Sequence, residues 1–213
     1  MDVAIPLFDR ITALDAVGPY EVLSRVPGAR VVFVGERTGV YRSEQNALGL
    51  VADATLEEMA SPDVVVVPGG MGTRALLGGG PLVEWIRRVH ATTEWTTSVC
   101  TGSLLLGAAG LLRGLEATTH WASLDLLPGF GAVPVERRVV EQGKVITAAG
   151  VSAGIDMALL LAARLAGDEV AQLIQLSIEY DPQPPFDAGS LQSAPPEIVA
   201  RAQAIRARRA AAG

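Results

Sequence analysis

The sequence has very little of the material that builds disulfides or metal sites. Its 213 residues include one cysteine, Cys100, and two histidines. A single cysteine cannot form an internal disulfide, and so few thiols and imidazoles leave little from which to build a zinc site. We therefore expect a chain that folds without disulfide bonds and holds no metal.

Long apolar runs are missing as well. A run such as Met157 to Ala163 is far shorter than the roughly 18 residues needed to cross a bilayer. The start of the chain, Met1 to Pro6, has no basic segment before an apolar one, which favours a first strand over a signal peptide. We expect no membrane segment and a cytoplasmic location.

Basic residues are in the minority. The chain carries 17 lysines and arginines against 23 aspartates and glutamates, a formal net charge of −6. Binding to nucleic acid would need a local basic surface that works against this overall field. The one arginine-rich stretch lies near the C-terminus, where no nucleic-acid-reading fold accompanies it, and we interpret it as a solvated face or subunit contact. Small-molecule chemistry fits the composition better.

The chain does contain a regular alternation of short β-prone runs and helical segments. Strands are predicted at 3–7, 29–34, 63–67, 96–100 and 144–149, with a short hairpin from 39–42 and 50–52. Helices are predicted to follow, one opened by Pro19 and others at 81–90, 102–109, 152–165 and 169–179. This pattern predicts an α/β fold with a single, mostly parallel sheet sandwiched by helices.

The character of the chain changes after Tyr180. Residues 181–190 are too rich in proline for a helix and are expected to be extended, and a terminal helix is predicted from Ala194 to Ala212. We predict one α/β domain over 1–190 and a helical extension of the same domain over 191–213.

Cys100 stands where a β-prone run switches directly to a helical one. In an open parallel sheet, the loops at the carboxyl ends of the strands line the ligand crevice. A cysteine that ends a strand and opens a helix lies near unpaired N–H groups and the positive end of the helix dipole, and both favour thiolate. The same N–H groups can stabilise a developing negative charge. The alternative is a small buried hydrophobe, the commoner fate of a free cysteine.

Three other loops offer partners for this thiol. Asp15 follows the first strand, where a carboxylate of raised pKa can shuttle a proton or, alternatively, simply cap a helix. Gly69 and Gly70 end the four-valine strand in a turn whose N–H groups can face the crevice or serve only the turn. His120 is a secondary candidate for a general base, because a histidine beside a tryptophan is more often a packed one.

Taken together, these motifs resemble a known family. The runs Val67-Pro68-Gly69-Gly70 and Ser98-Val99-Cys100-Thr101-Gly102-Ser103 are similar to those of the ThiJ/PfpI superfamily, which has a flavodoxin-like, class I glutamine amidotransferase-like fold with a nucleophile elbow. The segments at 14–22, 117–121, 150–156 and above all 179–190 resemble its isocyanide hydratase subgroup. The similarity spans nearly the whole chain.

The resemblance implies a homodimer that uses water to hydrate an isocyanide to an N-substituted formamide, through a covalent thioimidate and without metal or organic cofactor. By motif position, Cys100 is the nucleophile, Asp15 the acid and base, and Thr101 a hydroxyl that orders the site. The same motifs make Gly18, Gly69, Gly70, His120 and Val151 candidates for binding the substrate.

Two departures separate this chain from other branches of the superfamily. Threonine follows Cys100 where the protease-like branch has histidine, and Asp15 stands where the chaperone, deglycase and glyoxalase-like branches have glutamate. Two readings besides hydration remain open: a ligand-binding domain related to the sensory half of AraC-type regulators, and a redox sensor in which Cys100 is oxidised.

Overall fold

The structure, a computed structural model, describes residues 1–211, so Ala212 of the expected terminal helix lies outside the described residues. The chain divides into two compact units, 1–179 and 180–213. The first unit carries every element that concerns the site, and the second contains one helix, α7 (Pro196–Ala211). The domain boundary expected at residue 190 stays a prediction.

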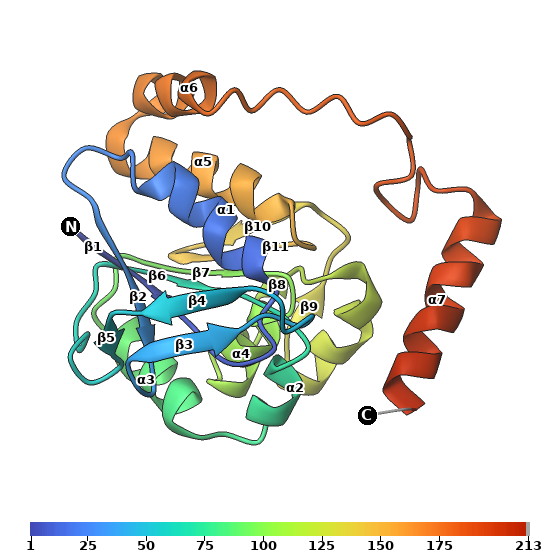
Figure 1. The fold of residues 1–213 in the computed structure, drawn as a ribbon, viewed down its shortest axis with the longest axis horizontal. Coiled ribbons are helices and arrows are strands. Elements are labelled where there is room, and N and C mark those ends of the chain that lie inside the picture. The colour runs from blue at the N-terminus through green and yellow to red at the C-terminus, as the bar shows by residue number, and fades with distance from the viewer. Residues whose placement is uncertain (212–213) are drawn as a thin grey trace. The chain divides into compact units, whose positions relative to one another are not determined.

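A seven-stranded sheet forms the centre of the first unit (Figure 1). Its strand order is β10-β11-β7-β6-β1-β2-β5, and every neighbouring pair is parallel except β10 with β11. The strands are β1 (Asp2–Pro6), β2 (Arg30–Gly35), β5 (Ala54–Thr55), β6 (Val64–Val67), β7 (Trp95–Val99), β10 (Val139–Gln142) and β11 (Val145–Ala148). The predicted α/β class with a mostly parallel sheet is confirmed.

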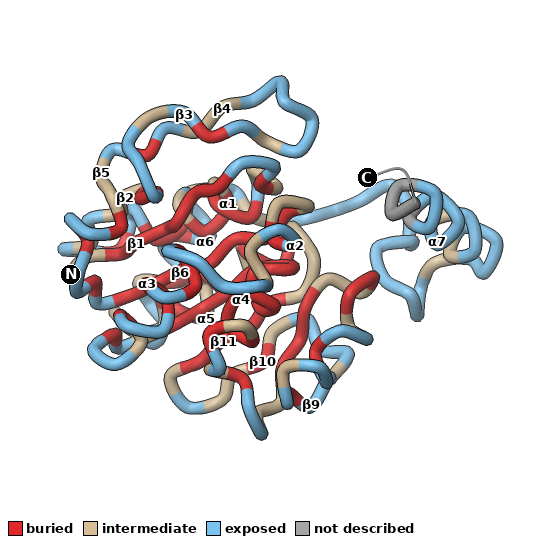
Figure 2. Tube along the Cα trace, turned by 90° about the horizontal axis from the view of Figure 1, so that it is seen from below, coloured by how far each residue is buried: buried red, intermediate tan, exposed pale blue. Residues whose placement is uncertain are grey.

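The central strands are apolar because both faces of the sheet are covered. All four valines of β6 and four of the five residues of β1 are buried. Figure 2 shows the buried segments gathered in these inner strands and in the helices against them. Such continuous apolar runs are typical of parallel strands between two helical layers.

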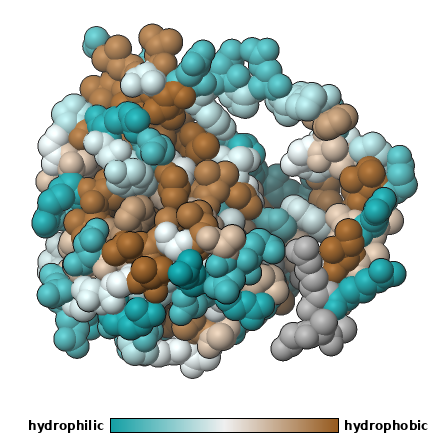
Figure 3. Space-filling model, viewed as in Figure 1, coloured by the Kyte–Doolittle hydropathy of each residue, from teal (hydrophilic) through white to brown (hydrophobic). Residues whose placement is uncertain are grey.

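Helices cover both faces of the sheet. On one face, α1 (Ala13–Leu23) packs along α5 (Ala153–Ala166), and α6 (Asp168–Ser177) packs on α5 (Figure 1). The other face carries α3 (Pro81–His90) and α4 (Gly102–Ala108), with the single turn α2 (Thr73–Leu76) beside α4. Apolar surface gathers over α6 in Figure 3, where Leu173 and Leu176 are exposed.

One predicted boundary on the site side is wrong. The helix expected to open at Pro19 begins at Ala13, so Pro19 lies inside it and Asp15 lies in its first turn instead of in a loop. The proline ring is accommodated because it is buried against α5, where a Cβ added to Gly154 would lie 3.4 Å from its Cγ. Packing on the neighbouring helix thus outweighs the local preference of proline for a helix start.

The remaining elements include a hairpin that was predicted and several elements that were not. The predicted hairpin is confirmed as β3 (Gly39–Arg42) paired antiparallel with β4 (Gly49–Ala52). The strands β8 (Glu116–Ala117) and β9 (Val133–Pro134), the strand β10 and a 3₁₀ segment η1 (Trp121–Phe130) were not expected from the sequence. The two-residue strands β8 and β9 are too short to produce a hydrophobic period.

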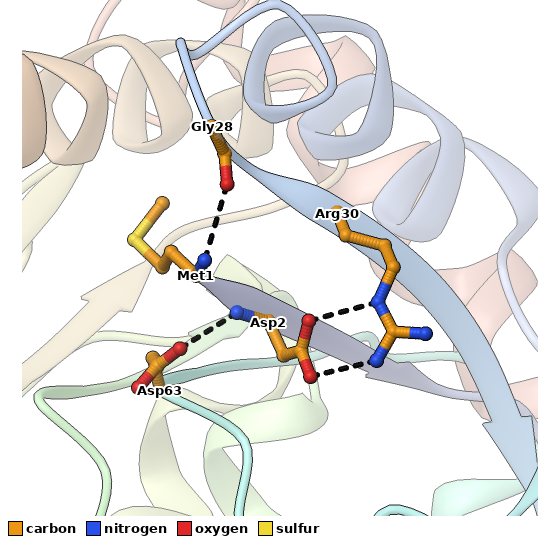
Figure 4. Close-up of polar contacts among 5 residues, drawn as sticks. All are labelled: Met1, Asp2, Gly28, Arg30 and Asp63. Carbon is orange, nitrogen blue, oxygen red and sulfur yellow. Dashed lines mark hydrogen bonds and ion pairs between the residues drawn. The ribbon is translucent and has the colours of Figure 1, made fainter.

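Polar contacts fasten the amino ends of β1, β2 and the segment before β6 (Figure 4). The Asp2 carboxylate accepts hydrogen bonds from Nε and Nη2 of Arg30 at 2.9 and 2.7 Å. The Asp2 N–H donates to Oδ2 of Asp63 at 2.7 Å. The N-terminal amino group donates to the carbonyl of Gly28 at 3.1 Å. These groups are at least partly exposed, and they fix the register at the end of the sheet opposite to the Cys100 elbow.

Candidate active site at the Cys100 elbow

Cys100 is the residue at which β7 turns into α4. Its φ of +55° lies in the left-handed region, which residues with a side chain seldom adopt. Its N–H is shared between the carbonyls of Ala148 and Ala149, at 3.1 and 3.0 Å, and its carbonyl accepts the hydroxyl of Thr119 at 2.8 Å. Both backbone groups are therefore satisfied, and the strained conformation is held from two sides.

The sharpness of the elbow depends on Gly102, the first residue of α4. A Cβ added there would lie 2.1 Å from the carbonyl oxygen of Val67 at the end of β6. Any side chain would push α4 away from β6 and move the elbow with it. The glycine that follows Cys-Thr in the sequence is thus required by this close approach.

The thiol is buried, and its surroundings act on it in opposite directions. Burial raises the pKa of the Cys100 thiol well above its usual value, and the nearby Asp15 carboxylate raises it further. The N–H groups of Thr101 and Val151 and the Thr101 hydroxyl interact with the sulfur and lower the pKa by less. The N–H groups thus favour the thiolate, as expected of the elbow, and burial opposes them more strongly.

Val151 reaches the sulfur through an unusual backbone. Its φ is +35°, which is rare for a β-branched residue, and it stands in the turn that leads from β11 into α5. This conformation directs its N–H at the thiol. Two amides from separate turns, those of Thr101 and Val151, thus face the same sulfur and would stabilise negative charge developing on it.

Asp15 lies across from the thiol in the first turn of α1 and is fully buried. Burial raises its pKa from 3.8 to about 7, against the opposing effects of the Gly69 N–H, which donates to Oδ2 at 2.9 Å, and of the Cys100 thiol. The other oxygen, Oδ1, has no hydrogen bond of normal geometry within the described residues. A carboxyl group with a pKa near 7 and a free oxygen can both give and take a proton at neutral pH.

Gly69, Gly70 and Thr101 form the floor between these two groups. The Gly70 N–H donates to Oγ1 of Thr101 at 2.9 Å, and the buried hydroxyl of Thr73 lies 3.2 Å from the same oxygen. A Cβ on Gly69 would lie 2.5 Å from the Thr101 nitrogen and 2.9 Å from Oδ2 of Asp15. Thr101 is thus fixed by hydrogen bonds, and the turn leaves no room for a side chain.

Glu44, from the turn between β3 and β4, reaches the edge of the same cluster. Its Oε1 accepts the Met71 N–H at 2.8 Å and the Thr12 hydroxyl at 3.0 Å. Its negative charge contributes to the raised pKa of Asp15, as the smallest of the four causes.

The two remaining predicted residues, His120 and Gly18, have different surroundings. A Cβ on Gly150, which precedes Val151, would lie 2.6 Å from Cδ2 of His120, so this imidazole packs beside the turn. Its Nδ1 accepts the Ala122 N–H at 3.2 Å, which makes it the N-cap of η1. Gly18 faces Ile155, where α1 packs on α5. The contacts of Gly18 are those of helix packing, and its role in binding substrate stays a prediction.

Sequence reasoning missed some of the residues that hold the elbow. Thr119 precedes His120 in a motif that drew attention only for the histidine. Its hydroxyl donates to the Cys100 carbonyl, and this role was not predicted. Glu44 lies in a polar stretch between two short strands, which signals only a turn. Neither role has a local pattern, because each is a contact between segments far apart in the chain.

Some other chemistries find no support within residues 1–211. No group of three or more histidine, cysteine, aspartate or glutamate side chains in this range is arranged to hold a metal ion. No helix of the described part is long and apolar enough to span a membrane. A surface hollow of about 390 Å³ lies between the β5 turn and α3, and its lining includes none of the predicted site residues.

Comparisons with known proteins agree with this arrangement. Residues 1–164 match the DJ-1/PfpI family. The chain is 45% identical over 203 residues to the isonitrile hydratase of Pseudomonas putida, covering 95% of this chain and 89% of that protein. The crystal structure of a ThiJ/PfpI family protein from Pseudomonas syringae superposes with a TM-score of 0.93 at 38% identity, covering 97% of this chain and 86% of that one.

A more distant relative bears on the ligand-binding alternative. The HTH-type transcriptional regulator CdhR of Pseudomonas aeruginosa is 33% identical over 138 residues, which is 63% of this chain and 40% of that protein. The match to the regulator therefore covers a smaller share of both chains than the match to the hydratase, and its sequence identity is lower.

Proposed function

This chain belongs to the DJ-1/PfpI family, and from that premise we propose that it is an isocyanide hydratase, an enzyme that converts an isocyanide and water into an N-substituted formamide. The observation that carries the proposal is the pairing of a buried thiol with a buried carboxyl group whose pKa is about 7, at the elbow between β7 and α4. The match to the isonitrile hydratase, at 45% identity, covers 95% of this chain.

In the first half of the reaction, the sulfur of Cys100 forms a bond to the terminal carbon of the isocyanide. The pKa of Cys100 is raised, so the thiol loses its proton only as it attacks, and the Asp15 carboxylate takes that proton. Asp15 then returns it to the same carbon. The product is a thioimidate, R–N=CH–S–Cys, which contains every atom of the thiol and the isocyanide.

In the second half, water adds to the thioimidate carbon. Asp15 accepts one proton from the attacking water and gives it to the nitrogen, which forms a tetrahedral adduct carrying N–H, O–H and the sulfur. As the carbon–sulfur bond breaks, Asp15 takes the remaining hydroxyl proton and gives it to the sulfur, and the carbon becomes a formyl group. Cys100 is released as a thiol. The N–H groups of Thr101 and Val151 stabilise the negative charge on sulfur at both stages.

The other residues have supporting roles in this proposal. Thr101 keeps the elbow and the Gly69–Gly70 turn in register, and that turn keeps the Asp15 carboxyl aimed at the thiol. We assign Val151, His120 and Gly18 to binding the substituent of the isocyanide. His120 packs beside Gly150, next to Val151, and Gly18 faces Ile155. No step requires a metal or an organic cofactor, because thiol, carboxyl and water balance the reaction.

The decisive experiment is to incubate the purified, reduced protein with an aryl isocyanide and to follow the formamide by NMR. We expect turnover by the wild type and a loss of about 10⁴-fold or more in Cys100→Ala, because no other thiol exists in the chain. Asp2→Asn at the opposite edge of the sheet is the control and should retain activity. A wild type that forms no formamide would overturn the proposal.

The same samples separate the two rival functions. A protein that binds the isocyanide without converting it would behave as a ligand-binding domain. A redox sensor would instead change its dimerisation or its binding to a partner after treatment with mild peroxide. It would have no hydratase activity before oxidation.

We further propose that the active form is a homodimer in the cytoplasm, with an isocyanide and water as its only partners. The exposed Leu173 and Leu176 on α6 support association, since adjacent apolar side chains on one helix favour burial against another surface. Sedimentation equilibrium of the purified protein measures this state directly.

A further inference from the structure

Glu44 makes contacts that its position in a surface turn does not require. A single carboxylate oxygen accepts hydrogen bonds from two segments: the Met71 N–H after the glycine turn and the Thr12 hydroxyl before α1. The Glu44 N–H donates to the carbonyl of Ile11 at 3.0 Å. The turn of the hairpin is therefore tied to the segment just before α1, whose first turn carries Asp15, and to the loop that carries Gly69.

The contact with Thr12 replaces a more usual one. Thr12 is the N-cap of α1, and a threonine there ordinarily accepts an N–H of the first turn with its side chain. Here its side chain makes no such bond and donates to Glu44 instead. The orientation of the first turn, which contains Asp15, thus depends on a residue outside the helix.

The charge of Glu44 acts on a site with few other charges. The groups that act on Asp15 are the Cys100 thiol, the Gly69 N–H and Glu44. The charged residues of the neighbouring elements are paired elsewhere. On α5, which packs along α1, Asp156 pairs with Arg138 and Arg164 pairs with Glu141. On α1 itself Glu21 pairs with Arg25, and β6 contains only valines. Glu44 is the only carboxylate among the groups that shift the Asp15 pKa.

We propose that Glu44 is a positioning residue for the hydration reaction, which holds the Gly69–Met71 turn and the first turn of α1 together so that the Asp15 carboxyl faces the Cys100 thiol. This role deepens the proposed function and rests on it. Glu44 acts through Thr12 and Met71 and does not touch the reacting atoms in this arrangement.

Two variants separate the hydrogen bonds of Glu44 from its charge. Glu44→Gln keeps an oxygen that can accept from both donors and removes the charge, whereas Glu44→Ala removes both. In the glutamine variant we expect kcat within about twofold of the wild type at the pH optimum, and an Asp15 pKa lower by roughly 0.5, because a repelling charge is gone. In the alanine variant we expect kcat to fall about tenfold or more with KM changed less than about threefold.

The titration of Asp15 is read without turnover, from ¹³C NMR of protein labelled at the aspartate carboxyl carbons. The signal of Asp15 is the one missing from Asp15→Asn. Glu57→Gln and Glu57→Ala, which change an exposed carboxylate after β5, are matched controls and should leave kcat and this titration unchanged.

The outcomes distinguish this inference from the proposed function. If Glu44→Ala keeps the wild-type kcat and Asp15 titration, or if Gln and Ala lower kcat equally, the positioning role is wrong. If the wild type forms no formamide while the Asp15 signal shifts in Glu44→Gln and broadens or shifts further in Glu44→Ala, the hydratase proposal fails and the tie between Glu44 and Asp15 stands.

Discussion

Two aspartates at opposite ends of the sheet show how differently one residue type can be used. Asp2, at the amino end of β1, is partly exposed, and its hydrogen bonds to Arg30 lower its pKa (Figure 4). Asp15, at the carboxyl end, is fully buried without a cation, and burial raises its pKa to about 7. The first carboxylate is ionised and satisfied, whereas the second is held close to the midpoint of its titration.

The contrast separates structure from chemistry. An ion pair at an exposed edge adds little to the free energy of unfolding, because water and salt screen it. Its contribution here is to hold the register of the strands. A buried carboxyl group with one oxygen unsatisfied costs stability, and proteins retain such groups where they are needed for reactions. Asp15 and Cys100 both follow the carboxyl ends of strands, where a parallel sheet usually binds its ligands.

The strongest way to break this contrast is to remove the proton-transferring capacity of Asp15. Asp15→Asn keeps the size of the side chain and an acceptor for the Gly69 N–H. We expect kcat/KM for the aryl isocyanide to fall by about 10² to 10⁴-fold, because general acid and base catalysis is lost. Formamide formation measures the effect, and near wild-type activity would remove the acid and base role from Asp15.

The second effect of the same substitution concerns stability. The folded pKa of Asp15 is raised above the unfolded value of 3.8 to about 7, so the folded state binds the extra proton between these values and wild-type stability falls as pH rises. Relative to Asp15→Asn, the wild type should lose up to about 4 kcal/mol between pH 4 and pH 8. Denaturant unfolding of both proteins at the two pH values measures it, and parallel pH profiles would contradict the raised pKa.

The smallest effect is expected at the exposed edge. The folded pKa of Asp2 is lowered, so its contribution is present above the unfolded value and is lost as pH falls through the folded one. Asp2→Asn should lower the denaturation midpoint slightly at pH 7 and leave kcat/KM within about twofold. A large loss of activity in this variant would mean that the two ends of the sheet are coupled.

Much of the fold is predictable because its signals are local. The four valines of β6 and the abrupt change of character at Cys100 identify strands and the elbow without any knowledge of their neighbours. The start of α1 was misplaced because Pro19 suggested a helix start, and only the packing on Gly154 shows why the ring fits inside. Tertiary contact overrode local propensity at that point.

The proximity of several predicted site residues could be inferred from the sequence, whereas the pKa shifts that burial causes could not, and the catalytic roles of these residues stay predictions. The sequence and its resemblance brought Asp15, Gly69 and Cys100 together, and the contacts between them are those expected. The N–H groups that face the sulfur were expected from the elbow, whereas the burial that raises the Cys100 pKa has no signal in the motif. Glu44 was missed because its partners, Thr12 and Met71, lie 32 and 27 residues away.

The assembly of the elbow from distant segments has a consequence for folding experiments. Asp15, Gly69, Cys100 and Val151 come from four separate turns, and Cys100 is only 5% exposed once they meet. Because it is the sole sulfhydryl in the chain, its protection from a thiol-modifying reagent appears only when these non-local contacts have formed. Intact mass after a pulse of such a reagent would thus measure the fraction of chains in which the contacts around Cys100 have formed.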